Sequence, residues 1–462
     1  MPSIWDSLSG PGAQIPGVLR GAAHTVSLSE LAAASALSAP PDTLRGKAVL
    51  VATGDQLNAA LALIELDGVA RRIVIATPDV SREHLRTVVA DAGVEAVIVD
   101  AGRAAESDLA PLALLAGPEL APVRTDRRGD RASEWVLLTS GTTGAPKLVL
   151  HTLESLGGAL PRRSDESLGR VWSTFYDIRR YGGMQIFLRA VLGGSPLVLS
   201  SPDEPVREFL ARAAAAGVTH ISGTPSHWRR ALMSGAAPLI RPQYVRLSGE
   251  IADQAVLDAL RAAYPGAVIA HAFASTEAGV AFDVTDGRAG FPATMIGAAD
   301  GPAAMRVADG TLRIRSARTA SRYLGAGAQP LVDADGYVDT GDMVELRDGR
   351  YYFVGRRGGV INVGGLKVHP EEIEAVINAD PRVRMSLVRG RRNPITGAVV
   401  VADVVLSDGA RAPNATEGSD SLKAELLDAC RKALPAHKVP TMLRFVPSLE
   451  LTPAGKLVRP GA

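Results

Sequence analysis

A run of hydroxyl and glycine residues that ends in a lysine, Thr139–Lys147, is the part of the sequence best suited to hold phosphate. Hydroxyls and glycine backbone amides at this density can surround phosphate oxygens, and Lys147 adds a positive charge. The same composition is common in flexible surface loops, so composition alone does not decide. The order excludes a Walker loop, which requires Gly-Lys-Ser/Thr at the start of a helix. Here Pro146 precedes the lysine, and Leu148–Leu150 is expected to be a strand.

Three further residues could do chemistry, namely Glu277, Asp342 and Lys456. A carboxylate such as Glu277 is a hard oxygen ligand suited to Mg²⁺. The ionised carboxylate of Asp342 can accept two hydrogen bonds. On their own, the two carboxylates could equally be charged residues of surface turns without a functional role, and a lysine near a chain end is usually solvated. The single cysteine, Cys430, excludes a disulfide within the chain and a cysteine-based metal site.

Alternating strands and helices must position these residues. Buried strands are expected over 46–52, 72–76 and 96–100, with helices up to Leu66 and over 81–92, which suggests a parallel α/β sheet. The first forty residues are expected to be an irregular lead-in with a short helix over 29–36. A second unit of the same style is expected to have strands over 196–200, 220–223, 244–248 and 268–273, and helices over 206–216, 226–233 and 253–264.

The pattern changes from about Gly301. Short strands and Asp-Gly turns at Asp309, Asp335 and Asp348 predict an antiparallel sheet. A small α+β unit is expected after Gly359, with helices over 370–378 and 422–434, strands over 385–388 and 398–406, and a polar loop over 407–421. The fold class is therefore α/β: a large N-terminal domain of α/β subdomains plus a distorted β-barrel-like region, and a small α+β C-terminal domain. We predict domains at 1–355 and 356–462.

Size and charge limit the function further. The chain has 462 residues, more than the roughly 250–300 at which a single core stops growing. Its hydrophobic fraction is 46% and its formal net charge is +1, which argues against a nucleic-acid partner. The sequence shows no secretory signal and no run of about 18 apolar residues, so no membrane span is predicted and the cytoplasm is the expected location.

The segment Thr139–Lys147 resembles the signature of the acyl-adenylate-forming superfamily, which includes acyl-CoA and aryl-CoA synthetases, peptide-synthetase adenylation domains and luciferases. Later motifs of that family are resembled, in its order, by Phe273–Glu277, Tyr337–Asp342, Phe353–Arg356 and Thr452–Arg459. Ala274 replaces the usual glycine. The resemblance implies a ligase that adenylates a small carboxylic acid with ATP and Mg²⁺, and then transfers the acyl group to coenzyme A or a carrier-protein thiol.

The resemblance also implies roles for single residues. Lys456 would bridge the carboxylate and the α-phosphate, Thr276 would bind the α-phosphate, and Glu277 would hold Mg²⁺. Phe273 would stack on adenine, and Asp342 and Arg356 would bind the ribose. The implied nucleotide-binding residues are Thr139, Ser140, Gly141, Thr142, Thr143, Gly144, Lys147, Ser248, Gly249, Glu250, Phe273, Ala274, Ser275, Asp342 and Arg356.

In the family the C-terminal domain is mobile: it rotates between the two steps, so that Lys456 leaves and another face, with Gly364 and Gly365, arrives. The usual hinge position carries Asp or Lys, but here it is Gly358, followed by Gly359. Glycine permits a large φ/ψ change without steric cost.

The substrate pocket is the least specified part. Its segment, Phe175–Gly183, departs from the usual histidine pattern and carries Arg179 and Arg180, which could pair with Asp177 as structure or face an anionic substrate group. The predicted pocket residues are Tyr176, Arg180, Gly182 and Gly223, with Thr224 and His227 near them. The acid and the oligomeric state are left open.

The acceptor is open as well. Coenzyme A is the first choice and a carrier-protein thiol the second. An amine, or nitrite in ATP-dependent diazotisation of an aryl amine, would be another nucleophile. A non-catalytic ATP-binding protein is the alternative of a different class, although the presence of Lys456, Asp342 and Glu277 argues against it.

Overall fold

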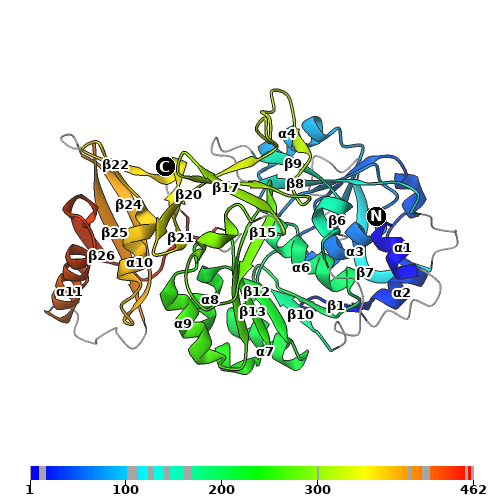
Figure 1. The fold of residues 1–462 in the computed structure, drawn as a ribbon. Helices are drawn as coiled ribbons and strands as arrows, with labels where there is room; N and C mark the ends of the chain where they lie inside the picture. The colour runs from blue at the N-terminus through cyan, green and yellow to red at the C-terminus, as the bar shows by residue number, and fades with distance from the viewer. Residues whose placement is uncertain are drawn as a thin grey trace.

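The computed structural model describes residues 2–9, 17–100, 113–122, 129–139, 146–160, 169–298, 301–393, 397–407, 417–452 and 456–458. Two eight-stranded sheets form the large part of the molecule, and a small α+β unit lies at the left in Figure 1. The predicted α/β class, with a large N-terminal and a smaller C-terminal part, is confirmed. Among the described residues, no helix is long and apolar enough to cross a membrane.

The first sheet has the order β15-β14-β13-β12-β10-β11-β1-β2 and is parallel from β1 to β14, with antiparallel strands at both edges. Its strands are β1 Val18–Arg20, β2 Thr25–Ser27, β10 Trp172–Thr174, β11 Leu197–Leu199, β12 His220–Gly223, β13 Tyr244–Ser248, β14 Val268–Ser275 and β15 Gly279–Val284. The associated helices are α6 Tyr181–Leu192, α7 Val206–Ala215, α8 Pro225–Met233 and α9 Gln254–Ala263.

The second sheet has the order β19-β9-β8-β5-β4-β6-β7-β3. Its strands are β3 Ala34–Leu37, β4 Ala48–Val51, β5 Arg72–Ile75, β6 Ala96–Asp100, β7 Ala113–Pro122, β8 Glu134–Thr139, β9 Lys147–Thr152 and β19 Arg322–Leu324. The helices of this half are α1 Ile4–Ser9, α2 Leu28–Ala33, α3 Gln56–Leu66, α4 Arg82–Ala92 and α5 Leu153–Gly157. Every residue of α3 is buried, which explains why its sequence is almost uniformly apolar rather than amphipathic.

An antiparallel five-stranded sheet, β16-β21-β20-β18-β17, follows and corresponds to the predicted barrel-like region as a partial half-barrel. Its strands are β16 Phe291–Pro292, β17 Ala304–Ala308, β18 Thr311–Arg315, β20 Val338–Arg347 and β21 Arg350–Arg356. Asp309 and Asp348 have positive φ, as expected for an aspartate in a tight turn. The predicted Asp-Gly turns at these two positions therefore join β17 to β18 and β20 to β21.

The small C-terminal unit begins after the 3₁₀ turn Arg357–Gly359. It contains β22 Ile361–Val363, β23 Leu366–Val368, α10 Pro370–Ile377, β24 Val383–Asn393, β25 Gly397–Leu406, α11 Glu417–Ala433 and β26 Met442–Phe445. These elements share a hydrophobic core of their own, which includes Ile373, Val404 and Leu426. The other 3₁₀ turns within the described residues are η1 Pro41–Leu44, η5 Ala237–Leu239, η6 Ala293–Met295 and η9 Ala436–Lys438.

Three expectations about local structure are wrong. The described part of the first forty residues, 2–9 and 17–40, is not an irregular lead-in: it contains α1, β1, β2, α2 and β3, and Ile4 and Leu19 are fully buried. The helix expected over 29–36 ends at Ala33, and the chain continues as β3. The last helix, α11, begins at Glu417, within the segment expected to be a polar loop.

Candidate active site

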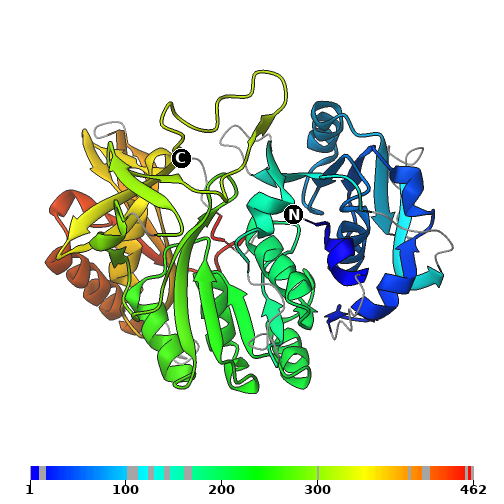
Figure 2. The ribbon, with the colours of Figure 1, turned by 45° about the vertical axis from the view of Figure 1, so that its right-hand side comes forward.

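The loops that follow β10, β12, β13 and β14 lie at the carboxyl edge of the first sheet, where open α/β sheets bind ligands. The C-terminal segment of the chain, red in Figure 2, runs from the small unit into the middle of the molecule beside the green strands of this sheet. It carries Lys456, whose side chain packs on the turn after β13: a Cβ built on Gly249 would lie 3.3 Å from Cε of Lys456. Gly249 has φ +87°, so glycine is favoured here for two reasons.

Short contacts fix the segment that carries Lys456. The backbone N–H of Thr452 donates to the carbonyl of Lys456 (2.7 Å), and Leu451 pairs with Leu457. The backbone N–H of Leu457 donates to Oε1 of Glu250 (3.2 Å). Glu250 also accepts from the backbone N–H and the hydroxyl of Ser226, at 2.9 and 3.0 Å. The predicted residues Gly249, Glu250 and Lys456 are thus brought together, with Glu250 holding the segment in place.

The charged groups near Lys456 shift its pKa in both directions. Its side chain is exposed, yet desolvation lowers its pKa, the positive charge of Arg356 lowers it further, and Glu250 and Asp342 act in the opposite direction. Arg356 and Asp342 are thus near enough to Lys456 to act on its charge.

Asp342 and Arg356 face each other across the β20–β21 hairpin. Nε of Arg356 donates to Oδ1 of Asp342 (3.0 Å), and the carboxylate raises the pKa of Arg356. The second oxygen, Oδ2 of Asp342, is buried and has no hydrogen-bond partner among the described residues. A buried acceptor without a partner costs about 1–3 kcal/mol, so this oxygen is suited to accept from a ligand hydroxyl.

The end of β14 carries the predicted motif Phe273–Glu277. One neighbour of the Phe273 ring is Phe353, stacked at 5.1 Å with an interplanar angle of 11°. The strand has an irregular register between Phe273 and Ala274, and Oγ of Ser275 accepts from the backbone N–H of Ala278 (3.0 Å). Thr276 and Glu277 follow in the turn to β15.

A tyrosine and a histidine that the sequence analysis missed hold this turn. The hydroxyl of Tyr323 donates to Oε1 of Glu277 (3.3 Å), and Nζ of Lys147 lies 5.2 Å from the Tyr323 ring centre. His151 is fully buried; its Nε2 bonds the carbonyl of Thr276 (2.7 Å) and its Nδ1 bonds Oγ of Ser155 (2.9 Å). Burial lowers the pKa of His151 to about 4, so it is a neutral support. The sequence feature that could have indicated this role is the position of His151 directly after the apolar run Leu148–Leu150.

The phosphate-loop prediction can be followed only at its ends. Thr139 ends β8 and Lys147 begins β9, and the two residues face each other in antiparallel register. Oγ1 of Thr139 is buried and has no partner among the described residues. Ser140, Gly141, Thr142, Thr143 and Gly144 lie outside the described residues.

The two arginines of the predicted acid pocket differ. Arg179 is a structural residue: it pairs with Asp177 (2.6 Å), donates to the carbonyl of Thr53, and its side chain has no exposed surface. Arg180 instead pairs with Asp79 (2.8 Å) and is partly exposed.

Of the other predicted pocket residues, Tyr176 lies on the same loop as the arginines, whereas Gly223 ends β12 and His227 lies in α8. The hydroxyl of Tyr176 donates to the carbonyl of Ser248 (2.8 Å). The rings of Phe175 and Tyr176 pack on His227, and a Cβ on Gly223 would lie 2.8 Å from the Phe175 ring. His227 accepts at Nδ1 from the backbone N–H of Thr224 (3.1 Å).

Helix α6 has two glycines near its start, Gly182 and Gly183, and only at Gly183 would a larger residue clash with the backbone. A Cβ on Gly183 would lie 2.1 Å from the carbonyl oxygen of Asp177, whereas a Cβ on Gly182 would lie 3.5 Å from the Tyr176 ring. We expect Gly183→Ala to destabilise the protein by at least about 2 kcal/mol, because backbone atoms must move. Gly182→Ala is the matched control and should change stability by less than about 1 kcal/mol. Urea unfolding measures both; equal stabilities would contradict the close approach.

Comparisons with known proteins agree with this arrangement. The profile of the family described as AMP-binding enzyme matches residues 53–315, and that of the AMP-binding enzyme C-terminal domain matches residues 372–456. The 2-succinylbenzoate–CoA ligase of Salmonella typhimurium is 28% identical over 352 residues, which are 74% of this chain and 73% of that protein.

Two solved structures show the same fold. That of the anthranilate CoA ligase AuaEII with anthranoyl-AMP has a TM-score of 0.77 at 16% identity and covers 98% of this chain and 95% of its own. That of the amide bond synthetase McbA from Marinactinospora thermotolerans has a TM-score of 0.76 at 21% identity and covers 98% and 96%.

Proposed function

The chain belongs to the AMP-binding enzyme family and is an AMP-forming acid ligase, and we propose that it adenylates an aromatic carboxylic acid with ATP and passes the acyl group to coenzyme A. One observation carries the proposal for this molecule: the C-terminal segment places Lys456 against Gly249, within electrostatic reach of the Asp342–Arg356 pair. A cation at that position is what the attack of a carboxylate on a phosphate requires.

The first step brings two anions together. We assign Lys456 to bridge the carboxylate and the α-phosphate, which offsets their repulsion and the charge that develops in the transition state. Oδ2 of Asp342 would accept from a ribose hydroxyl, and the Phe273 ring would pack on adenine. Thr139, Lys147 and Thr276 would contact the phosphates. Residues Ser140–Gly144, which lie between Thr139 and Lys147 in the sequence, would contact them as well.

Magnesium fits the donor set at the turn after β14. Among the described residues, no cluster of three or more His, Cys, Asp or Glu side chains could hold a metal ion. Mg²⁺ in nucleotide sites is commonly held by one or two carboxylates plus phosphate oxygens, and Glu277, with one oxygen engaged by Tyr323, could be such a ligand. The ion would neutralise phosphate charge when bound.

An aromatic acid suits the rings that surround His227. Phe175 stacks on His227 at 5.4 Å, and the Tyr176 ring meets it edge-on at 6.0 Å. Aromatic side chains favour a flat ring as a neighbour. The proposal also agrees with a relative that acts on 2-succinylbenzoate.

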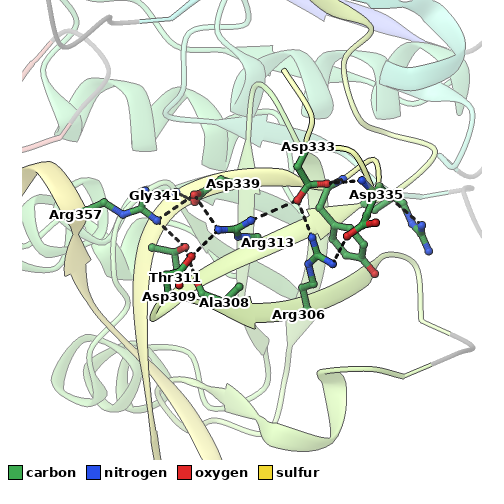
Figure 3. Close-up of polar contacts among 12 residues, drawn as sticks. Arg306, Ala308, Asp309, Thr311, Arg313, Asp333, Asp335, Asp339, Gly341 and Arg357 are labelled. Atoms are coloured by element: carbon green, nitrogen blue, oxygen red, sulfur yellow. Dashed lines mark hydrogen bonds and ion pairs between the residues drawn. The ribbon is translucent and has the colours of Figure 1, made fainter. Parts of the chain in front are cut away.

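The transfer step needs a second orientation of the C-terminal unit. The sequence predicts the division at 355/356, but β21 runs to Arg356, and we propose that the hinge lies slightly later, at Gly358 and Gly359, immediately after Arg357. Figure 3 shows Arg357 held on the large unit: Nη2 donates to Oγ1 of Thr311 (2.9 Å) and to Oδ2 of Asp339 (3.0 Å). Because Arg357 is anchored, rotation would be confined to the two glycines that follow.

The hinge gives a prediction about one glycine. A Cβ on Gly358 would meet nothing within 4 Å, and its φ is not in the left-handed region. Gly358→Ala should therefore leave adenylation and the thermal midpoint unchanged, and slow acyl transfer by about three- to tenfold by restricting the φ/ψ change. Rapid-quench measurement of acyl-AMP formation and of its transfer to coenzyme A separates the steps. Slower adenylation would place the hinge elsewhere.

The overall activity is tested by ATP–pyrophosphate exchange with aromatic, short-chain and long-chain acids, followed by competition between coenzyme A, a carrier protein, amines and nitrite for the adenylate. Acid-dependent exchange and a coenzyme A thioester are expected. The fold is shared with an amide bond synthetase, so an amide product is the main alternative outcome. ATP binding without exchange for any acid would overturn the proposal in favour of a binding protein.

A further inference from the structure

Arg180 occupies the same edge of the first sheet as Lys456. It ends the loop between β10 and α6 and is the residue that immediately precedes that helix. The loop is tied to the catalytic turn, because the Tyr176 hydroxyl donates to the carbonyl of Ser248, next to Gly249. Arg180 also contributes electrostatically at Lys456: desolvation and then Arg356 lower the pKa of that lysine most, and Arg180 acts in the same direction.

The guanidinium of Arg180 is held by its ion pair with Asp79, but one of its donors has no partner among the described residues. Nη2 donates to both oxygens of Asp79 at 2.8 Å, and the side chain is 25% exposed. Nε is buried and has no partner among the described residues. A buried donor without an acceptor is costly, and guanidinium pairs well with carboxylates. Its neighbour Arg179, in contrast, is fully buried and fully used by Asp177 and the Thr53 carbonyl.

The other charged groups near Lys456 have partners already. Asp342 and Arg356 pair with each other, and Glu250 accepts from Ser226 and Leu457. The carboxylate to be adenylated would be taken by Lys456. Because Asp342 and Arg356 are assigned to the ribose, the guanidinium of Arg180 is the described cationic group near Lys456 that we assign to the rest of the acid.

We propose that Arg180 is a specificity-determining residue whose guanidinium, oriented by Asp79, pairs with a second carboxylate of the acid beside the carboxylate that is adenylated. The preferred substrates are therefore dicarboxylic acids. This inference rests on the proposed function and deepens it: the aromatic side chains around His227 would select an aromatic acid, and Arg180 would select a second carboxylate on that acid.

The test compares acids that differ in one group. ATP–pyrophosphate exchange is measured with benzene-1,2-dicarboxylate, its monoamide 2-carbamoylbenzoate, and benzoate, using the full-length protein, Arg180→Gln, Arg180→Lys and the control Arg241→Gln, an exposed arginine before β13. For the wild type we expect kcat/KM to be at least tenfold higher for the diacid than for its monoamide. Arg180→Gln should lower kcat/KM for the diacid about 10- to 100-fold, mainly through KM, and change benzoate by less than about threefold.

Arg180→Lys keeps the charge but not the planar fork, so it should retain part of the diacid preference, and Arg241→Gln should retain all of it. If Arg180→Gln does not fold, the diacid-to-monoamide ratio of Arg180→Lys decides, with a reduction of at least threefold expected. An unchanged ratio in the Arg180 variants, or an equal loss for all three acids, would overturn the inference alone. Absence of exchange with any acid of the wider screen would overturn the proposed function, and this inference with it.

Discussion

Lys456→Ala is expected to slow formation of the acyl-adenylate by about 10²–10³-fold while ATP affinity stays within about threefold. The magnitude is that of removing one preorganised charge that acts mainly in the transition state. ATP affinity should persist because the Asp342–Arg356 pair and the Phe273 ring lie on the large unit. Single-turnover quench experiments give the rate, and calorimetric titration gives the affinity.

The matched control is Lys432→Ala, which removes an exposed lysine from α11 that pairs only at the surface with Asp428 (2.7 Å). Exposed pairs of this kind contribute little, so this variant should behave as the wild type. An adenylation rate of Lys456→Ala within threefold of the control would refute the role assigned to the lysine, as would an ATP affinity that falls as far as the rate.

Asp342→Asn should raise KM for ATP about 10- to 100-fold, with a smaller change in kcat. The substitution keeps the size of the side chain but removes the charge that Arg356 faces and replaces one acceptor oxygen with a donor nitrogen. Hydrogen bonds to charged groups contribute about 1.5–3 kcal/mol, which corresponds to this loss. The orphaned Oδ2 in the structure is the atom that we assign to the ribose.

Asp339→Asn is the control for that measurement, because Asp339 lies three positions earlier on the same strand and contacts Arg357 instead. It should leave KM for ATP within about threefold. If both substitutions change KM equally, Asp342 has no special place in nucleotide binding, and if neither does, the ribose site lies elsewhere.

Several of the parallel strands could be predicted within one or two residues because they are short apolar runs bounded by turns, whereas β7, β10 and β26 were not predicted. β6 and β13, for example, start and end where their sequences predict. The three-residue strands β1 and β2 could not, since Val18–Arg20 and Thr25–Ser27 become strands only by pairing, in the case of β1 with β11, far along the chain. Such non-local pairing leaves no local pattern.

The candidate site, like the strands, could be predicted from the sequence only in part. The order of motifs indicated Lys456, Asp342 and Glu277, and the structure brings Lys456 near Asp342. The contacts around the site could not be predicted from the sequence, because Arg180 and Asp79 are 101 residues apart and Tyr323 and Glu277 are 46 residues apart. Tertiary structure alone creates these contacts. The roles of Ser140–Gly144 stay a prediction.

The two large sheets are built from interleaved stretches of chain. β1 and β2 begin the first sheet, the chain then forms most of the second, returns to complete the first, and finally adds β19 to the second beside β9. Neither sheet can therefore be completed until residues from both ends of the large unit have been synthesised. Long-range pairing of this kind slows folding, so we infer that each sheet acquires its final structure late: the first cannot be completed before β15, which ends at Val284, and the second cannot be completed before β19, which ends at Leu324.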